Sequence, residues 1–428
     1  MSSGLKVVKG MKDTLPDEIA AWHYVESQIR TLIASYGYNE IRMPILEQTE
    51  LFKRAIGEVT DIVEKEMYTF EDKGGETLTL RPEGTAQTVR CVLENSLIRN
   101  QSQRLWYYGP MFRRENPQKG RYRQFYQFGV EAFGLAGPDV DAEQILMMAR
   151  LWRKVGLEKK VVLKLNSLGL ATERATYRAA LVEYFKANAQ MLDEDSQRRL
   201  QTNPLRILDS KNPAMQSMIA KAPILLDYLG PESLDHFTKL QQLLNKAGVS
   251  FEVDPRLVRG LDYYTHTVYE WVTTELGSQG TVCAGGRFND LVSQMGGPAT
   301  AGVGFAMGVE RLIMLLVDNN LIPTQNPVDV YCVAEGNSAE EQVFMLAEQL
   351  RNALPSLRLL VNCGGGSFKS QFKKADKSGA RFAIILGEEE ISKEIMSIKA
   401  LREDMPQATV TLSEAIAFFK TRLTVSQQ

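Results

Sequence analysis

The sequence predicts an α+β protein, in which an antiparallel sheet flanked by helices is interrupted by a helical insertion and followed by a smaller α/β domain. Strand-like segments follow one another between residues 76 and 134, which favours antiparallel pairing. Helical sequence fills residues 171–248, and strand and helix alternate from residue 329 onward. We therefore expect a main domain of residues 1–170 and 249–322, the insertion 171–248, a linker 323–328 and a C-terminal domain 329–428.

The composition is that of an ordinary globular protein, with 44% hydrophobic and 24% charged residues among 428. The formal net charge of −2 excludes a generally basic nucleic-acid binder and leaves room for a local positive face, so we expect no DNA partner. No apolar run reaches the ~18 residues of a membrane span and the N-terminus lacks the apolar core of a signal peptide, so we expect a cytoplasmic protein without a membrane partner. The cysteines are scattered without a CxxC pair and are expected to be free thiols: Cys91, Cys283, Cys332 and Cys363.

The N-terminal elements follow from periodicity. Apolar residues at steps of three and four predict an amphipathic helix within residues 13–38, with Gly37 at its end. A short strand is expected at 39–46, where Pro44 favours an edge, a bulge or a bend because proline cannot donate to a strand ladder. Further strands are predicted at 76–82, 103–113 and 122–134.

The later elements are read in the same way. Helices are expected at 171–192, 214–230 and 232–248, and strand character returns at 250–290. A glycine-rich strand then runs into a helix within residues 300–319. After the proline-bearing segment "LIPTQNPVD", strands and helices alternate over segments that begin at 328, 336, 356, 367 and 381.

The segment "MFRRENPQKGRYRQFYQFGVE" (111–131) joins two aromatic strands through a polar loop. It combines guanidinium groups that suit phosphates, an aromatic ring that suits a purine, and a carboxylate that suits an exocyclic amine. A nucleotide site is one interpretation, and a solvated hairpin with surface charges is the other. "GVGFAMGVER" likewise offers either close core packing or a backbone that a ligand can approach, with Arg311 in the first turns of a helix.

Two shorter segments carry polar groups in unusual surroundings. "RPEGTAQ" (81–87) follows a strand, and Glu83 and Thr85 could meet an ammonium group; a helix N-terminus with Pro82 at its first position explains the same residues. "LVRGLDYYTHTVYE" (257–270) has the β-branched and aromatic residues of a strand, yet it includes an arginine, an aspartate and two adjacent tyrosines.

Taken together, these segments resemble a known family. "YGYNEIRMPILEQTELF", "FRRE" with "RQFYQFGVE", and "GVGFAMGVERL" resemble in order the three signature motifs of class II aminoacyl-tRNA synthetases, while "RPEGT" and "LVRGLDYY" resemble segments typical of the histidyl-tRNA synthetase family. The resemblance covers the insertion and the C-terminal domain as well. It implies a class II catalytic domain with a C-terminal anticodon-binding domain, which activates L-histidine with ATP and transfers the histidyl group to the 3′ end of tRNA(His).

The resemblance also implies roles for individual residues at the nucleotide. Arg259 and Arg113 would hold the α-phosphate, with Arg259 also on the substrate carboxylate. Glu115 would face the adenine amine, and Phe125 and Arg311 would lie on opposite faces of adenine. Arg121 would lie near the base or the phosphates. Mg²⁺ is expected on the ATP phosphates, with no ligand in the protein assigned.

At the amino acid, the resemblance assigns the imidazole to Glu131 and Tyr264, and the α-amino end to Glu83, Thr85 and Gln127. Tyr263 would support the pocket wall or serve packing alone, and Asp262 is unassigned. None of the three histidines is needed as a base because the attacking carboxylate is already ionised. We expect structural roles for His23 and His236 in helices, and His266 follows Tyr264 on the same face only if strand alternation is regular.

The resemblance further implies a homodimer and two contacts with tRNA. Gln118 and Arg123 would read the acceptor end from the motif-2 loop. The C-terminal domain would bind the anticodon, and its local positive charge comes from Lys369, Lys373, Lys374, Lys377 and Arg381. Solvated helix faces explain the same lysines.

Two other classes of protein are compatible with parts of the chain. A non-catalytic regulatory subunit of histidine biosynthesis resembles this catalytic domain, but it lacks the anticodon module and several motif residues that are present here. A dinucleotide-dependent enzyme is suggested by "NCGGGSFKS" after a strand. Three consecutive glycines do not reproduce the GxGxxG spacing, and no acidic residue ends a second strand at the expected distance.

Overall fold

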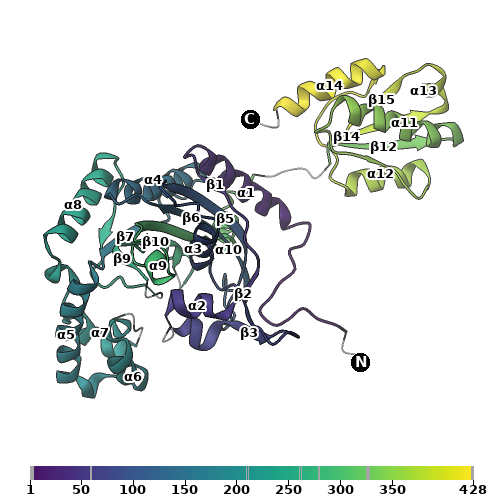
Figure 1. Ribbon diagram of the computed structural model, residues 1–428. Coiled ribbons are helices and arrows are strands. Elements are labelled where there is room, and N and C mark those ends of the chain that lie inside the picture. Colours follow the sequence, from purple (N-terminus) through teal and green to yellow (C-terminus); the bar gives the residue numbers. More distant parts are fainter. Residues whose placement is uncertain are drawn as a thin grey trace. The chain divides into compact units, whose positions relative to one another are not determined.

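The structure is a computed structural model that describes residues 4–425 except 58–59, 209, 211, 260, 262, 278–279 and 324–327. It divides into two compact units, residues 1–322 and 323–428, which are described separately (Figure 1). In the described parts of both units, every helix is too short or too polar to cross a membrane.

A largely antiparallel sheet forms the centre of the first unit. Its strands lie in the order β1 (Asn39–Glu40), β5 (Gln103–Phe112), β6 (Gln124–Phe133), β11 (Gly302–Gly308), β10 (Thr281–Arg287), β9 (Thr265–Val272), β7 (Val162–Ser167) and β8 (Glu252–Val253). Only the two described edge pairs, β1 with β5 and β7 with β8, are parallel. The predicted antiparallel sheet is therefore confirmed.

Helices cover both faces of this sheet, because its strands are apolar on both sides. On β6, Phe128 and Val130 pack with α1 (Ile19–Ala34), α4 (Pro138–Lys154), α8 (Pro231–Lys246) and α10 (Val309–Asp318). Phe133 of the same strand instead joins the cluster that contains α2 (Thr49–Ile56), α3 (Thr85–Glu94) and α9 (Leu291–Gln294). The side chains alternate between these two cores, as the strand period of two requires.

The predicted strand at 39–46 is divided in two. β1 ends at Glu40, and β2 (Leu46–Gln48) belongs to a separate three-stranded sheet with β4 (Thr77–Leu80) and β3 (Tyr68–Glu71). Pro44 lies in the turn between them, where its missing N–H costs no ladder bond. The strands at 76–82 and 103–113 were expected to follow one another without a helix between them, and this was wrong, because α3 separates β4 from β5 and β4 belongs to the smaller sheet. A short π-helix, Ile62–Glu66, precedes β3.

Between β7 and β8 the chain is helical, as the sequence predicts. The elements are α5 (Ala171–Ala187), η2 (Ala189–Met191), α6 (Glu194–Thr202), η3 (Pro204–Ile207), η4 (Pro213–Met215), α7 (Gln216–Ala220), η5 (Leu225–Tyr228) and α8. Prolines begin η3, η4 and α8, where a missing N–H is tolerated. The predicted helix at 214–230 is divided into short pieces around Pro223.

The second unit has a five-stranded sheet in the order β13 (Leu359–Val361), β12 (Val330–Glu335), β14 (Phe382–Gly387), β15 (Met396–Ala400) and β16 (Ala408–Val410). The first three strands are parallel, as alternation of strand and helix predicts, and the last two are antiparallel. Its helices are α11 (Asn337–Ala353), α12 (Phe368–Lys377), α13 (Glu388–Ser392) and α14 (Leu412–Val425). Most of the predicted linker, 324–327, lies outside the described residues.

Candidate active site

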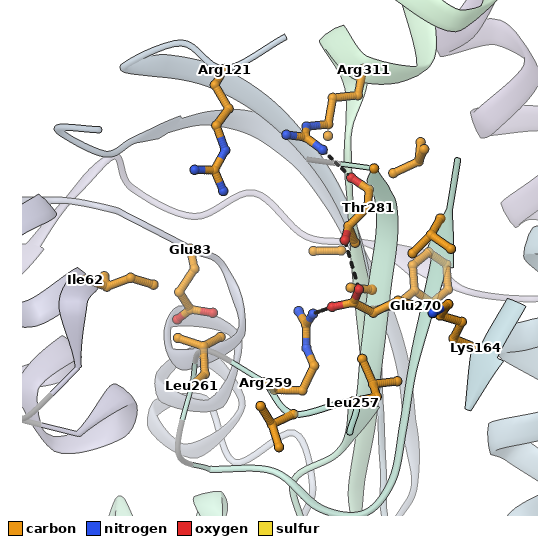
Figure 2. Close-up of a pocket in the computed structure, with 18 of the residues that line it drawn as sticks. Ile62, Glu83, Arg121, Lys164, Leu257, Arg259, Leu261, Glu270, Thr281 and Arg311 are labelled. Atoms are coloured by element: carbon orange, nitrogen blue, oxygen red, sulfur yellow. Dashed lines mark hydrogen bonds and ion pairs between the residues drawn. The ribbon is translucent and has the colours of Figure 1, made fainter. Parts of the chain in front are cut away.

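A cavity of about 1060 Å³ opens in the first unit beside β6, β9, β10 and β11. The structure brings most of the predicted site residues to its wall: Glu83, Thr85, Arg113, Glu115, Arg121, Phe125, Gln127, Arg259, Tyr263, Tyr264 and Arg311. Figure 2 shows Glu83, Arg121, Arg259 and Arg311 around this space. Segments separated by more than 200 residues thus contribute to one site.

One end of the cavity is acidic. α3 begins at Thr85, and the Glu83 carboxylate accepts hydrogen bonds from the backbone N–H of Thr85 at 2.7 Å and of Ala86 at 2.8 Å. We expected Pro82 to be the first helical residue, but α3 begins three residues later. The helix N-terminus is instead capped by a carboxylate two residues before it. Burial nevertheless raises the pKa of Glu83 above its ordinary value.

Glu131 lies directly behind this end. The Thr85 hydroxyl donates to its Oε1 at 2.7 Å, while its Oε2 is buried without a hydrogen-bond partner. Burial raises the pKa of Glu131 well above its usual range, and the neighbouring Glu83 adds to the shift. Thr85 thus contacts both carboxyl groups, Glu83 through its backbone N–H and Glu131 through its hydroxyl, and this buried pair can receive a ligand that brings hydrogen-bond donors or positive charge.

Sequence reasoning missed Tyr107, which supports this acidic end. Its ring lies so close to Gly84 and Gly129 that a Cβ at either position would be 2.3 or 2.2 Å from a ring atom. Its hydroxyl lies 3.5 Å from Glu131 Oε1. The cross-strand pairing of Tyr107 with Gly129 is the signal that could have identified it. The two glycines thus leave the space that the phenol fills.

The two adjacent tyrosines form another part of the wall. Tyr263 and Tyr264 are both buried, with ring centroids 4.7 Å apart. Tyr263 also packs edge-on against Phe288 at 6.0 Å, in accordance with a supporting role. The Arg259 guanidinium lies 5.6 Å from the Tyr264 ring centroid and links the tyrosines to the arginines.

Arginines also line the cavity, and each of the four that the sequence predicted is held by a neighbour. Arg259 forms an ion pair with Glu270, whose second oxygen accepts from the Thr281 hydroxyl at 2.8 Å (Figure 2). Arg311 donates to the Thr281 carbonyl. Thr281 therefore connects the two arginines through its side chain and its backbone.

The remaining two arginines come from the motif-2 segment. Arg113 donates from Nε to the Pro82 carbonyl at 2.8 Å, and its guanidinium lies 5.4 Å from the Phe125 ring centroid. Arg121 forms an ion pair with Glu115. These arginines can therefore attract an anion while they are already oriented.

Two residues that the sequence suggested for tRNA lie outside the cavity wall. Gln118 is exposed in the loop between β5 and β6. The Arg123 guanidinium donates to the carbonyls of Glu115 at 3.2 Å and Lys9 at 3.3 Å, so it joins the loop to the N-terminal segment. Asp262 lies outside the described residues.

The strand alternation assumed for His266 is absent. His266 has a φ of +45°, and the pairing of β9 with β10 is irregular at this point. Its imidazole stacks on His236 of α8 at 5.1 Å instead of lining the cavity. His236 in turn lies 3.5 Å from Asp141, which forms a fully buried ion pair with Arg287. His23 is exposed on α1. All three histidines thus occupy positions away from the wall of this cavity.

The described residues contain no group of three or more His, Cys, Asp or Glu side chains that could hold a metal ion. The wall of the cavity carries both guanidinium groups and carboxyl groups. This arrangement suits a substrate that carries a polyanion at one end and a base or an ammonium group at the other.

Comparisons with known proteins agree with this geometry. The family model described as histidyl-tRNA synthetase matches residues 10–312, and the model described as anticodon binding domain matches residues 327–422. The crystal structure of apo S. aureus histidyl-tRNA synthetase is 36% identical, with a TM-score of 0.81, and the match covers 97% of this chain and 100% of that one.

Two more distant structures share the fold. Histidyl-tRNA synthetase from Nostoc sp. PCC 7120 is 21% identical, with a TM-score of 0.71 over 98% of this chain and 99% of that one. An ATP phosphoribosyltransferase regulatory subunit/histidyl-tRNA synthetase from Bacillus halodurans C is 23% identical, with a TM-score of 0.63 over 90% of this chain and 98% of that one. The whole-chain match at 36% identity and the family model settle the assignment: the chain belongs to the histidyl-tRNA synthetase family, class II ligases that activate histidine and attach it to tRNA(His).

Proposed function

We propose that histidyl-adenylate forms in this cavity, with histidine at the acidic end and ATP at the arginine end. The observation that carries the proposal is that oriented arginines and buried carboxyl groups meet at one cavity, with Glu83 in its wall and Glu131 behind it. The reaction requires the histidine carboxylate to attack the α-phosphorus, so two anions must meet. Guanidinium groups fixed beforehand lower the barrier by positioning and by electrostatic stabilisation, and no base is needed.

At the acidic end, Glu131 and Tyr264 bind the imidazole, and Glu83, Thr85 and Gln127 surround the α-ammonium group. The unpartnered oxygens of Glu131 and Gln127 support this assignment, because both are buried acceptors that a donor would satisfy. A site with buried polar partners rejects analogues that lack the matching group, since those partners are then left unpaired. Tyr263 supports Tyr264 from behind.

At the arginine end, Arg113 and Arg259 bind the α-phosphate, and Arg259 also binds the histidine carboxylate. Adenine lies between Phe125 and Arg311, with its amine near Glu115 and with Arg121 close to the base or the phosphates. The substrate is the magnesium complex of ATP, in which Mg²⁺ shields the outer phosphate oxygens and keeps much of its coordination to phosphate and water.

The second unit binds the anticodon of tRNA(His), and Gln118 and Arg123 lie near the acceptor end. Among the basic residues of the second unit, Lys369, Lys373 and Lys377 are exposed on α12 and available to phosphates. Lys374 instead donates to the Gly365 carbonyl at 3.1 Å, so we assign it to the fold. We propose that residues 171–248 form an inserted helical domain and that the protein is a cytoplasmic homodimer.

Amino-acid-dependent ATP–pyrophosphate exchange without tRNA tests the activation step. We expect exchange with histidine alone among the twenty amino acids and a loss of at least about 100-fold in Arg259→Ala, because removal of one transition-state donor costs that much in other enzymes. Arg153→Ala, which removes an exposed arginine that forms an ion pair with Glu158, is the control. Thermal unfolding of both variants shows whether the cavity variant is folded.

The absence of exchange with every amino acid, in folded wild-type protein, would overturn the proposal. That result would favour a non-catalytic regulatory subunit that shares this fold.

A further inference from the structure

Glu310 lines the cavity but has no role in the assignments above. It is the second residue of α10, next to Arg311, and both of its carboxylate oxygens accept from the backbone N–H of Tyr126, at 2.8 and 3.0 Å. Tyr126 directly follows Phe125 on β6. The Glu310 carboxylate thus connects α10 to Tyr126 of β6. Its own neighbour Arg311 and Tyr126's neighbour Phe125 are the two residues that we place on either side of adenine.

The place of this bond in the sheet explains why a side chain makes it. The ladder between β6 and β11 ends with Gln127 opposite Gly308, and β11 then gives way to α10. On the other side of β6, Tyr126 lies opposite Pro110 of β5. The Tyr126 N–H is therefore one residue beyond the end of the β11 ladder, and the Glu310 carboxylate takes the place of the missing strand acceptor.

Aromatic side chains hold Tyr126 of β6 on the face of the sheet that is opposite the cavity. The Tyr126 ring packs edge-on against Trp22 of α1 at 5.2 Å and tilts against Tyr108 at 5.5 Å. Because side chains alternate along β6, Phe125 points to the cavity while Tyr126 points to α1. Tyr126 is thus fixed through its ring by α1 and through its amide by α10.

We propose that Glu310 is a positioning residue that sets the gap between Phe125 and Arg311, and thereby the fit of the adenine ring. The inference rests on the proposed roles of Phe125 and Arg311. Glu310 itself touches neither substrate nor reacting atoms in this proposal. It acts by holding the end of β6 at a constant distance from the start of α10.

The groups that face Glu310 predict a distinctive pH response. The titratable groups that face Glu310 are Tyr108 of β5 and Tyr126 of β6. Glu26 of α1 accepts from the Tyr108 hydroxyl at 2.7 Å, and the charged Arg311 follows Glu310 on α10. Burial raises the pKa of Glu310 to about 7. A protonated carboxyl is a weaker acceptor than a carboxylate, so the bond to the Tyr126 amide weakens as the pH falls through this value.

The test compares Glu310→Ala and Glu310→Gln with wild type in two measurements, MgATP binding by calorimetry without histidine and ATP–pyrophosphate exchange. Loss of a charge-assisted hydrogen bond predicts roughly a tenfold rise in the Kd and KM for ATP in Glu310→Ala, with an unchanged KM for histidine. Glu310→Gln keeps one acceptor oxygen and should rescue most of the loss. Glu26→Gln, which removes a carboxylate from the same aromatic cluster, is the matched control.

Two further readouts separate positioning from a general loss of stability. Between pH 8 and pH 6 the KM for ATP should rise more in wild type than in Glu310→Gln, because ionisation of ATP itself is common to both. The effects of Glu310→Ala and Phe125→Leu on the Kd for ATP should also be less than additive, because both act on the same gap.

An unchanged Kd for ATP in Glu310→Ala, or equal rises in KM for ATP and histidine, would overturn the inference. Wild-type protein that binds ATP but exchanges no pyrophosphate would instead overturn the proposed function, and the Kd comparison would still decide the role of Glu310.

Discussion

Gly304→Ala is predicted to damage histidine recognition without adding or removing a polar group. A Cβ at this position of β11 would lie 1.7 Å from Glu131 Oε2 and 2.5 Å from the Val130 carbonyl oxygen. Since Cβ contacts under 3.0 Å essentially never occur, the carboxylate oxygen must retreat by about 1.3 Å, from 1.7 Å to at least 3.0 Å. We expect this movement to break the 2.7 Å bond from the Thr85 hydroxyl to Glu131.

The magnitude follows from that bond. Loss of a hydrogen bond to a charged or partly charged group costs about 1.5–3 kcal/mol, which corresponds to roughly a 10- to 150-fold fall in kcat/KM for histidine. Overpacking of the strand adds a stability loss of about 1–3 kcal/mol. Steady-state exchange, measured once with histidine and once with ATP as the varied substrate, separates lost recognition from lost stability, because only kcat/KM for histidine should fall strongly.

Gly297→Ala is the control for overpacking. Its Cβ would meet Leu93 at 2.4 Å and Val292 at 2.8 Å, and neither side chain belongs to the cavity wall. It should lower the melting temperature and leave both KM values near wild type. A Gly304→Ala enzyme with full kcat/KM for histidine, or with equal losses for histidine and ATP, would refute the reasoning.

Three other predictions concern stability, the nucleotide and tRNA. Asp141→Asn should lower the free energy of unfolding by about 3–5 kcal/mol in urea titrations, because it leaves Arg287 buried without its charged partner. Burial acts to raise the pKa of Asp141, but the hydrogen bond with His236 and the charge of Arg287 lower it overall. This contribution is therefore present above the unfolded pKa of about 3.9 and is lost as the pH falls through the lower folded pKa, so the wild type and variant should converge in acid. Phe125→Ala should raise the KM for ATP about tenfold through lost stacking and leave the KM for histidine unchanged, as exchange kinetics would show. Charge reversal at the exposed lysines of α12, Lys369, Lys373 and Lys377, should weaken tRNA binding and make it less dependent on salt in filter-binding assays. The rate of ATP–pyrophosphate exchange should stay at the wild-type value.

Much of the fold could be predicted because local signals and tertiary structure agree. The periodicity of α1, the aromatic strands β5 and β6, and the change from β11 to α10 at Gly308 are all visible in the sequence. The predictions fail where tertiary packing, and not the local sequence, determines the structure. The irregular backbone at His266 lets its imidazole stack on His236, and no local pattern indicates that contact.

The site residues could be selected by resemblance, but their partners could not. Thr85 and Glu131 are 46 residues apart in the chain, so the bond between them depends on where α3 meets β6. Arg123 is a further case. The resemblance implies that it lies near the tRNA acceptor end, but only the structure shows that its guanidinium donates to two backbone carbonyls.

In the proposed arrangement, the groups that bind ATP and those that bind histidine solve different electrostatic problems. Each of the four arginines assigned to ATP is already oriented by a carboxylate or a carbonyl, as Glu270 orients Arg259, so we expect little reorganisation when charge develops on the α-phosphate. At the proposed histidine site, Glu131 keeps one buried oxygen without a partner and its pKa is raised well above the ordinary value. That cost of burial is relieved only when a ligand supplies a donor, and this makes binding selective for a ring that carries one. Orientation in advance therefore favours rate at the proposed ATP site, and an unsatisfied acceptor favours specificity at the proposed histidine site.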